Sequence, residues 1–298
     1  MKIKALIILI FCLTSTASYL SWAQPISSAG QKVKYTPANK ECFSVSRPRA
    51  WKYCVHTPKE GSSNGDIAYL LHGRGQTEDN WNDDTFYTAQ IQQYWQQRKI
   101  SPPTVVSISF GPVWLLNTKG KQPASGLADI FTNEVIPTVE LRLGKPVRRL
   151  LFGESMGGIN TLVLGLKHPE LFKKIAALCP PVYLGTPFDS EKDLQDFIDR
   201  TGADPAEIKN VLMLAKMFYA DKDEWLAHAP HQMIQNMVPE NAPALYLSCG
   251  LYDKFGNYEG TEALSVRALQ NKFQLDWVPL YGPHCAVDIK SVAEFLTN

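Results

Sequence analysis

The sequence predicts an α/β fold in which a mostly parallel sheet of about eight strands is covered by helices on both faces. Short apolar runs alternate along most of the chain with longer segments whose apolar residues recur at helical spacing. The run at 67–71 is continuously apolar, which is typical of a strand buried on both faces. The 298 residues, 45% hydrophobic and 20% charged, have a globular composition and fit one large domain as well as two smaller ones.

Residues 1–23 are predicted to be a secretory signal peptide. Two lysines near the N-terminus precede an apolar run at 5–13, and small residues lie three and one positions before a cut after Ala23. A membrane anchor is the alternative, but this run is far shorter than the ~20 residues that a span requires. Cys12 would suit a lipoprotein, but Phe11 stands where a small residue is expected. We therefore expect a mature domain at 24–298 in a secreted or periplasmic protein.

The first half of the chain is predicted to start with an antiparallel pair and to continue with alternating strands and helices. The segment 24–40 is polar and contains two prolines and a glycine, so we expect a loose leader. The other elements follow from their apolar spacing. They are strands at 41–46, 51–56, 67–71 and 104–110, and helices at 85–97 and 127–143, the last with a kink expected at Pro137.

One stretch combines a strand, a sharp turn and a helix around a serine. The β-prone run 149–152 leads into Gly153-Glu154-Ser155-Met156-Gly157-Gly158, and apolar residues at helical spacing follow. Gly-x-Ser-x-Gly in this context is the pattern of a nucleophile elbow, which holds the serine at a strained positive φ and needs small neighbours where strand and helix crowd together. The helix N-terminus then favours an anion at the serine.

The alternation of strands and helices stops after a strand at 175–178. Helical, polar-rich stretches dominate 183–240, which we interpret as an insertion after the sixth strand that forms a lid or side wall. Helices are predicted there at 190–201, 205–219 and 223–228. The alternation then resumes with strands at 244–249 and 273–280 and helices at 260–272 and 286–296.

A serine nucleophile requires a base, and in this architecture the chain order is serine, acid, histidine. His284 follows the last strand in a loop that Gly282 and Pro283 shape, and it is the candidate base. The remaining histidines are less suitable, because they precede the serine, lie at the C-terminal end of the helix that follows it, or lie in the insertion. They are His56, His72, His168, His228 and His231.

The acid is expected after the preceding strand, and Asp253 stands there, four residues past the predicted strand end on a turn that contains Gly250. Asp276 lies too early in its strand for this role. Asp221 and Asp223 lie in the insertion and are most simply solvated helix residues.

An oxyanion hole requires two backbone N–H donors, one from the residue after the nucleophile and one from the loop after an earlier strand. Met156 supplies the first. Arg74, in the loop His72-Gly73-Arg74-Gly75, is the candidate for the second, with Gly73 as the alternative. We expect His72 to shape this loop. Among the aromatic residues near these loops, Trp114 and Tyr252 are candidates for substrate binding.

Five cysteines remain after removal of the leader, so at least one is unpaired within a monomer. Cys42 and Cys54 lie on two short strands that a hairpin could bring together. Cys249 and Cys285 fall near the ends of the last two strands. Either pair could form a disulfide, or the thiols could be free, and the spacing leaves the connectivity open.

The elbow at Ser155, the short Leu-His-Gly loop at 71–73, Asp253 and His284 resemble the α/β-hydrolase superfamily. The Leu-His-Gly loop and the turn Gly-x-x-Asp-x-Phe at 250–255 are similar to the group around esterase D, feruloyl and acetylxylan esterases, and polyhydroxybutyrate depolymerases. This resemblance runs from about residue 50 to 298 and is interrupted by the insertion. It implies the α/β-hydrolase fold and carboxylic-ester hydrolysis through an acyl-serine intermediate.

The resemblance leaves two other enzymatic activities open, an acyltransferase and a serine peptidase, beside a non-catalytic binding protein. We expect a small-molecule, polysaccharide or lipid ester as substrate, and the oligomeric state stays open. The net charge is +1, without a basic stripe, so nucleic-acid binding is not expected. No histidine pair at the helical i, i+4 spacing and no Cys-x-x-Cys occurs, so we expect neither a metal nor a cofactor.

Overall fold

The computed structural model describes residues 26–27, 32–46, 49–59, 61–119 and 126–298. The predicted signal peptide at 1–23 lies outside these ranges. Within them, every helix is too short or too polar to cross a lipid bilayer.

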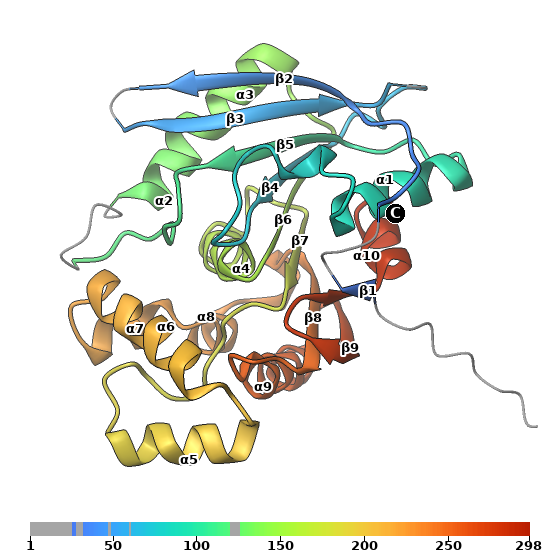
Figure 1. Ribbon diagram of the computed structural model, residues 1–298. Coiled ribbons are helices and arrows are strands. Elements are labelled where there is room, and N and C mark those ends of the chain that lie inside the picture. Colours follow the sequence, from blue (N-terminus) through green and yellow to red (C-terminus); the bar gives the residue numbers. More distant parts are fainter. Residues whose placement is uncertain (1–25, 28–31, 47–48, 60, 120–125) are drawn as a thin grey trace, which may run out of the picture.

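Within the described ranges, eight strands form one twisted sheet in the order β2-β3-β5-β4-β6-β7-β8-β9 (Figure 1). Strand β3 is antiparallel to both of its neighbours, and the strands from β5 to β9 across the sheet are parallel. The predicted fold class is therefore confirmed. The strands are β2 (Asn39–Val45), β3 (Trp51–Thr57), β4 (Ile67–Leu71), β5 (Thr104–Ser109), β6 (Arg149–Glu154), β7 (Lys174–Leu178), β8 (Ala244–Tyr252) and β9 (Leu275–Pro283).

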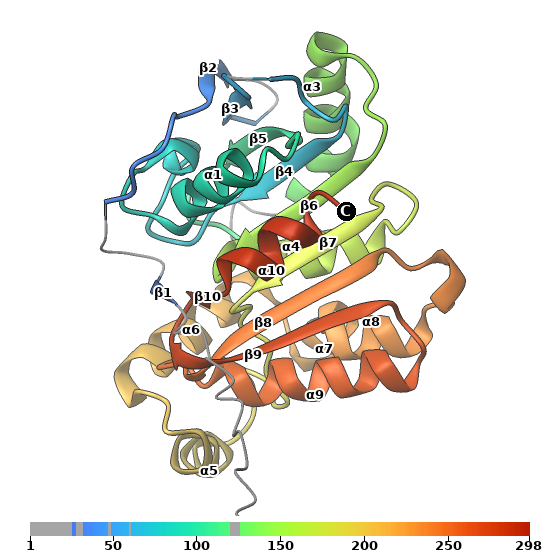
Figure 2. The same ribbon diagram turned by 90° about the vertical axis from the view of Figure 1, so that its right-hand side faces the viewer.

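Helices cover both faces of the sheet, as Figure 2 shows. One face packs against α1 (Tyr87–Arg98) and α10 (Ile289–Phe295), and its core contains large aromatic side chains such as Trp81 and Phe152. The other face packs against α2 (Leu127–Ile130), α3 (Ile136–Leu143), α4 (Met156–Lys167), α8 (Pro230–Asn236) and α9 (Asn257–Gln270). Since the central strands β4 and β7 are buried on both faces, their side chains are apolar in continuous runs.

The chain between β7 and β8 forms α5 (Glu191–Thr201), α6 (Pro205–Phe218), α7 (Lys222–His228), α8 and the short η3 (Pro239–Asn241). The first three agree with the predicted helices because their starts carry strong capping signals. Ser190 and Asp193 form a capping box, and Asp204 caps α6 ahead of Pro205. Helix α8 was missed: it has seven residues, and no side chain caps its start.

The predicted helix at 127–143 is divided by a π-helical turn at Phe131–Val135. Pro137 lies at the second position of α3, so the π-helical turn lies just before the residue at which the kink was expected. A short 3-10 turn, η1 (Asn80–Asn82), precedes α1.

Two predictions about the ends of the domain were wrong in part. The segment 24–40 is not loose throughout, because β1 (Ile26–Ser27) pairs antiparallel with β10 (Ala286–Val287), and β2 already begins at Asn39. The closing helix starts at Ile289 and not at Ala286 as predicted, because Ala286 and Val287 form β10. Its first turn is capped by Asp288, whose carboxylate accepts a hydrogen bond from the N–H of Ser291.

Candidate active site

Ser155 lies at the sharp turn between β6 and α4 with a φ of +50°. A non-glycine residue in this region is strained, and such strain persists only where the surrounding structure fixes it. Here the N–H of Ser155 donates to the carbonyl oxygen of Leu178 at the end of β7 (2.8 Å). The turn therefore presents the serine hydroxyl above the carboxyl edge of the sheet.

The glycines of the elbow are required because a larger residue would clash with neighbouring backbone. A Cβ on Gly157 would lie 1.9 Å from the carbonyl oxygen of Leu71, and one on Gly153 would lie 2.5 Å from the same atom. Helix α4 thus packs with its backbone against the end of β4. This close approach brings the loop after β4 next to the serine.

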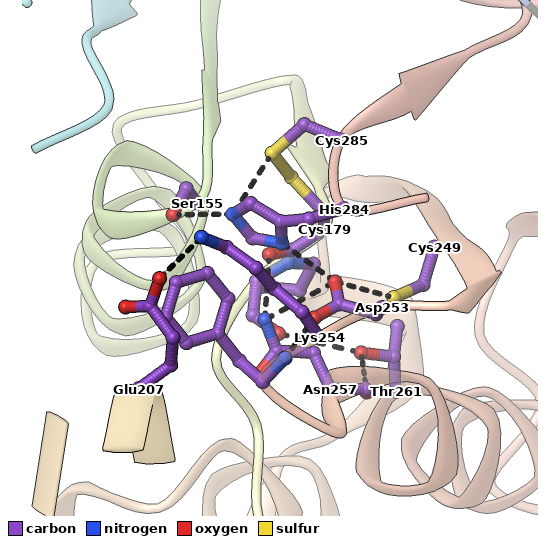
Figure 3. A network of polar contacts seen from close by, with 12 residues as sticks. Ser155, Cys179, Glu207, Cys249, Asp253, Lys254, Asn257, Thr261, His284 and Cys285 are labelled. Carbon is purple, nitrogen blue, oxygen red and sulfur yellow. Dashed lines mark hydrogen bonds and ion pairs between the residues drawn. A yellow bond between two sulfur atoms is a disulfide. The ribbon is translucent and has the colours of Figure 1, made fainter. Parts of the chain in front are cut away.

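Ser155, His284 and Asp253 form one chain of hydrogen bonds (Figure 3). The hydroxyl of Ser155 donates to Nε2 of His284 (3.0 Å), and Nδ1–H of His284 donates to Oδ2 of Asp253 (2.6 Å). A carboxylate only accepts, so this contact fixes the tautomer that leaves Nε2 free to take the serine proton. The buried carboxylate also accepts from the N–H of Phe255 (2.9 Å) and the amide of Asn257 (3.4 Å), which hold it in place.

Asp253 stands directly after β8, because this strand runs to Tyr252 and not only to Cys249. The prediction that it follows the strand by four residues was therefore wrong, although its place in the chain order is as expected. Residues 245–250 pair regularly with β9, and the register shifts between Gly250 and Tyr252. A Cβ on Gly250 would lie 2.1 Å from the carbonyl oxygen of Pro283, so only glycine allows the loop of His284 to approach β8 this closely.

The two predicted backbone donors lie at the same pocket as Ser155. Met156 begins α4, where N–H groups have no acceptor within the helix, and Arg74 lines the pocket from the loop after β4. The N–H of Gly73 instead donates to the side-chain oxygen of Gln76 (3.1 Å). This contact disfavours Gly73 as a donor to substrate and leaves Arg74 as the candidate.

His72 is buried and shapes this loop. Its Nδ1–H donates to the carbonyl oxygen of Gly73 (2.7 Å), and its Nε2 accepts from the hydroxyl of Ser109 (2.8 Å). Burial lowers the pKa of the imidazole, so the ring is neutral and serves as a brace between β4 and β5.

Sequence reasoning missed Glu154, the residue immediately before the nucleophile. Its side chain is buried, and its Oε1 accepts a hydrogen bond from the side-chain N–H of Gln76. The side-chain oxygen of Gln76 accepts in turn from the backbone N–H of Gly73. Burial raises the pKa of the Glu154 carboxyl to about 8, because the one hydrogen bond from Gln76 does not offset the loss of water. The signal available in the sequence was a charged residue at the end of a strand that is otherwise apolar.

A pocket of about 320 Å³ opens beside Ser155. Trp114 lines it, as predicted, and packs against Phe218 of the insertion with ring centroids 5.2 Å apart. Tyr252 does not line it. That side chain is exposed and packs edge-on against Tyr281. The insertion supplies one wall through α6, with Glu207, Asn210, Val211, Met213, Leu214 and Phe218.

Two disulfides are present in the described part of the chain. Cys42 and Cys54 face each other across β2 and β3 and are bonded. Cys285 is bonded to Cys179, so the pairing of Cys285 with Cys249, which the sequence left open, does not form. The reason is the position of each cysteine. Cys179 directly follows β7 and lies beside the loop of His284, while Cys249 is buried with its thiol directed at Asp253 Oδ2 (3.6 Å).

Two clusters of potential metal ligands occur among the described residues, and both contain a disulfide. They are Cys179 and Cys285 with His284, and Cys42 and Cys54 with Asp79. Sulfur atoms that are joined in a disulfide do not offer the thiolates that bind metals.

Comparisons with known proteins decide the family. The sequence matches the family described as "Putative esterase" over residues 44–281, more than half of the chain. The chain belongs to this esterase family. It is therefore an esterase, and the resemblance seen in its motifs is confirmed.

One relative is an endo-1,4-beta-xylanase/feruloyl esterase of Xylanibacter ruminicola, 29% identical over 111 residues, which are 36% of this chain and 15% of that protein. Two solved structures share the fold. A ferulic acid esterase has a TM-score of 0.60 at 14% identity, with 88% of this chain and 95% of that chain covered. The fluorophosphonate-binding serine hydrolase F of Staphylococcus aureus has a TM-score of 0.57 at 17% identity, with 88% and 100% covered.

The raised pKa of Glu154 predicts a pH-dependent stability difference. From the ordinary value near 4.5 up to about 8, the folded esterase holds a proton that the unfolded chain has lost, so its stability falls as pH rises through this range. Glu154→Gln removes this effect. Urea unfolding at a series of pH values should show that Glu154→Gln gains stability relative to wild type between pH 5 and pH 8, by on the order of 3–5 kcal/mol.

The matched control is Glu240→Gln, which replaces an exposed carboxyl on η3 and should follow the wild type. A stability difference between Glu154→Gln and wild type that stays constant from pH 5 to pH 8 would contradict the assignment of a neutral carboxyl at Glu154.

Proposed function

We propose that the chain is a secreted carboxylic-ester hydrolase in which Ser155 is the nucleophile, His284 the general base and Asp253 the acid that orients it. The observation that carries this proposal is the continuous hydrogen-bond chain through these three side chains beside a pocket. Three residues that are far apart in the sequence meet with the donor and acceptor order that acyl transfer requires.

The proposed reaction has two halves. Oγ of Ser155 attacks the ester carbonyl carbon while Nε2 of His284 takes its proton, and the tetrahedral oxyanion accepts from the N–H groups of Met156 and Arg74. His284 then gives the proton to the departing alcohol. In the second half, His284 activates a water molecule that hydrolyses the acyl-serine, and Asp253 stabilises the imidazolium in both halves.

Secretion is proposed from two features of the chain. The N-terminal 23 residues have the composition of a signal peptide, and two disulfides are of the kind that persists in oxidising compartments.

The pocket favours an acyl group with a flat apolar face. Beside Ser155 its wall includes the rings of Trp114, Phe218 and Phe255, and Asn210 and Glu207 supply polar atoms that could accept or donate to a ring substituent. The names of two similar proteins refer to ferulic acid, a hydroxylated aromatic acid. We therefore propose an aromatic acyl ester as the substrate class.

The role of Ser155 is tested with short p-nitrophenyl esters and a fluorophosphonate probe. Ser155→Ala should lower kcat by at least about 10⁴-fold and abolish labelling, because it removes the oxygen that forms the proposed acyl-enzyme. Ser101→Ala, which changes an exposed loop serine, should keep both.

If Ser155→Ala kept its rate, the site assignment would be wrong. A wild-type protein that neither hydrolyses esters nor reacts with the probe would favour a binding protein. Product analysis with acceptor alcohols and peptides separates hydrolysis from acyl transfer and from peptidase activity.

The aromatic acyl proposal is tested by Trp114→Leu. This change should lower kcat/KM for methyl ferulate by about 10-fold, since a stacking surface is lost, while p-nitrophenyl acetate is affected less than about threefold. Tyr252→Ala, which lies outside the pocket, should leave kcat/KM unchanged for both methyl ferulate and p-nitrophenyl acetate. Equal losses on both substrates in Trp114→Leu would show that Trp114 does not contact the acyl group.

A further inference from the structure

The Cys179–Cys285 disulfide lies against the candidate base itself (Figure 3). Cys285 follows His284 in the chain, and its sulfur is 3.3 Å from the same Nε2 that faces Ser155. The bond joins residues 106 positions apart, with a Cα–Cα distance of 5.1 Å. Both cysteines are buried.

The other end of this disulfide is tied to the nucleophile. Cys179 follows Leu178, and the carbonyl oxygen of Leu178 accepts from the N–H of Ser155 (2.8 Å). The N–H of Cys179 in turn donates to the carbonyl oxygen of Ser248 on β8 (2.7 Å). The backbones of Ser155 and His284 are therefore connected through the dipeptide 178–179 and one covalent cross-link.

The imidazole of His284 is also held by its hydrogen bond to Asp253 and by the ring of Phe255, whose centroid lies 4.6 Å from its own, so the disulfide acts together with these contacts. Strand β9 ends at Pro283, and in the described part of the chain Ala286 and Val287, which follow the cysteine, pair with the short strand β1. Both ends of the disulfide are also held at positive φ, +42° at Cys179 and +55° at Cys285. Non-glycine residues keep such angles only when the surrounding structure enforces them, and here the cross-link is the covalent part of that enforcement.

We propose that the Cys179–Cys285 disulfide positions His284 against Ser155, so that the turnover of the folded esterase depends on its oxidation state. This inference rests on the proposed triad. The two cysteines act through His284 and take no part in bond making with the substrate. Loss of the bond would let the imidazole drift from the serine hydroxyl, and a misplacement of about 1 Å costs on the order of 10²-fold in rate.

The redox step is an exchange with a dithiol such as dithiothreitol. The Cys179–Cys285 bond breaks, the reductant closes its own disulfide, and its two protons and two electrons end on the two cysteine thiols. Reoxidation by a disulfide reagent reverses each change. The molecule also carries a matched control, since Cys42–Cys54 joins β2 to β3 at the other edge of the sheet.

The first experiment compares C179A/C285A with C42A/C54A. A disulfide that only stabilises the fold would lower the melting temperature of its variant without changing kcat of the folded protein. We expect C179A/C285A, assayed well below its melting temperature and folded by circular dichroism, to lose kcat by at least about 10-fold while KM stays within about threefold. Fluorophosphonate labelling of Ser155 should slow in parallel, and C42A/C54A should keep kcat.

The second experiment needs no variant and covers the case in which C179A/C285A fails to fold. Wild-type protein is treated with increasing dithiothreitol, and alkylation with peptide mass analysis reports which bond is open. Cys42 is exposed and its bond should open first without loss of activity. Activity should fall with opening of Cys179–Cys285 and return on reoxidation.

Three outcomes decide the matter. Activity that follows the state of Cys179–Cys285 supports the inference. Full kcat in folded C179A/C285A, or in wild type with this bond open, overturns the inference. In that case, labelling of Ser155 in untreated protein leaves the proposed function standing. A wild type that neither labels nor turns over ester overturns the proposed function and this inference with it.

Discussion

The positive-φ turn at Ser155 is the constraint on which the rest of the site depends. The turn places the hydroxyl above the sheet edge because the backbone of α4 packs against the ends of β4 and β6 without side chains between them, at Gly157 of the helix and Gly153 of β6. The same approach sets the loop of Arg74 beside the N-terminus of α4. One local conformation therefore determines both where the nucleophile lies and where the two candidate oxyanion donors lie.

Two buried carboxyl groups flank this turn, and their surroundings differ. Asp253 accepts hydrogen bonds from an imidazole, a backbone N–H and an amide, which is the environment of a carboxylate that orients a base. Among the described residues Glu154 accepts one hydrogen bond, from Gln76, and burial makes its neutral form the favoured one near pH 7. A neutral Glu154 places no negative charge next to the site at which the oxyanion would develop.

The sequence was most informative where a residue type has a steric or chemical necessity. The glycines around Ser155, the chain order that selects His284 and the turn at Asp253 all followed from such necessity, and the strand–helix alternation predicted the sheet. What depends on contacts between distant segments was not predictable in the same way. The pairing of Cys179 with Cys285 needs β7 and the loop after β9 to be placed first, and a free Cys249 looked equally suitable.

The same limit applies to the pocket and to the ends of elements. Trp114 was found because it follows a strand at the correct edge, whereas Tyr252 satisfied the same rule and turns outward onto Tyr281. The wall that α6 contributes depends on how the insertion folds back over the sheet. No periodicity in the chain encodes that docking, and strand ends such as that of β8 depend on pairing with β9.

The most direct test of the account is the structure of the protein after reaction with diethyl p-nitrophenyl phosphate, a phosphorylating ester that stops at the tetrahedral stage. We expect phosphorus bonded to Oγ of Ser155. The phosphoryl oxygen should lie within about 2.7–3.2 Å of the backbone nitrogens of Met156 and Arg74. Phosphorus on any other residue, or a phosphoryl oxygen directed away from both N–H groups, would contradict this expectation.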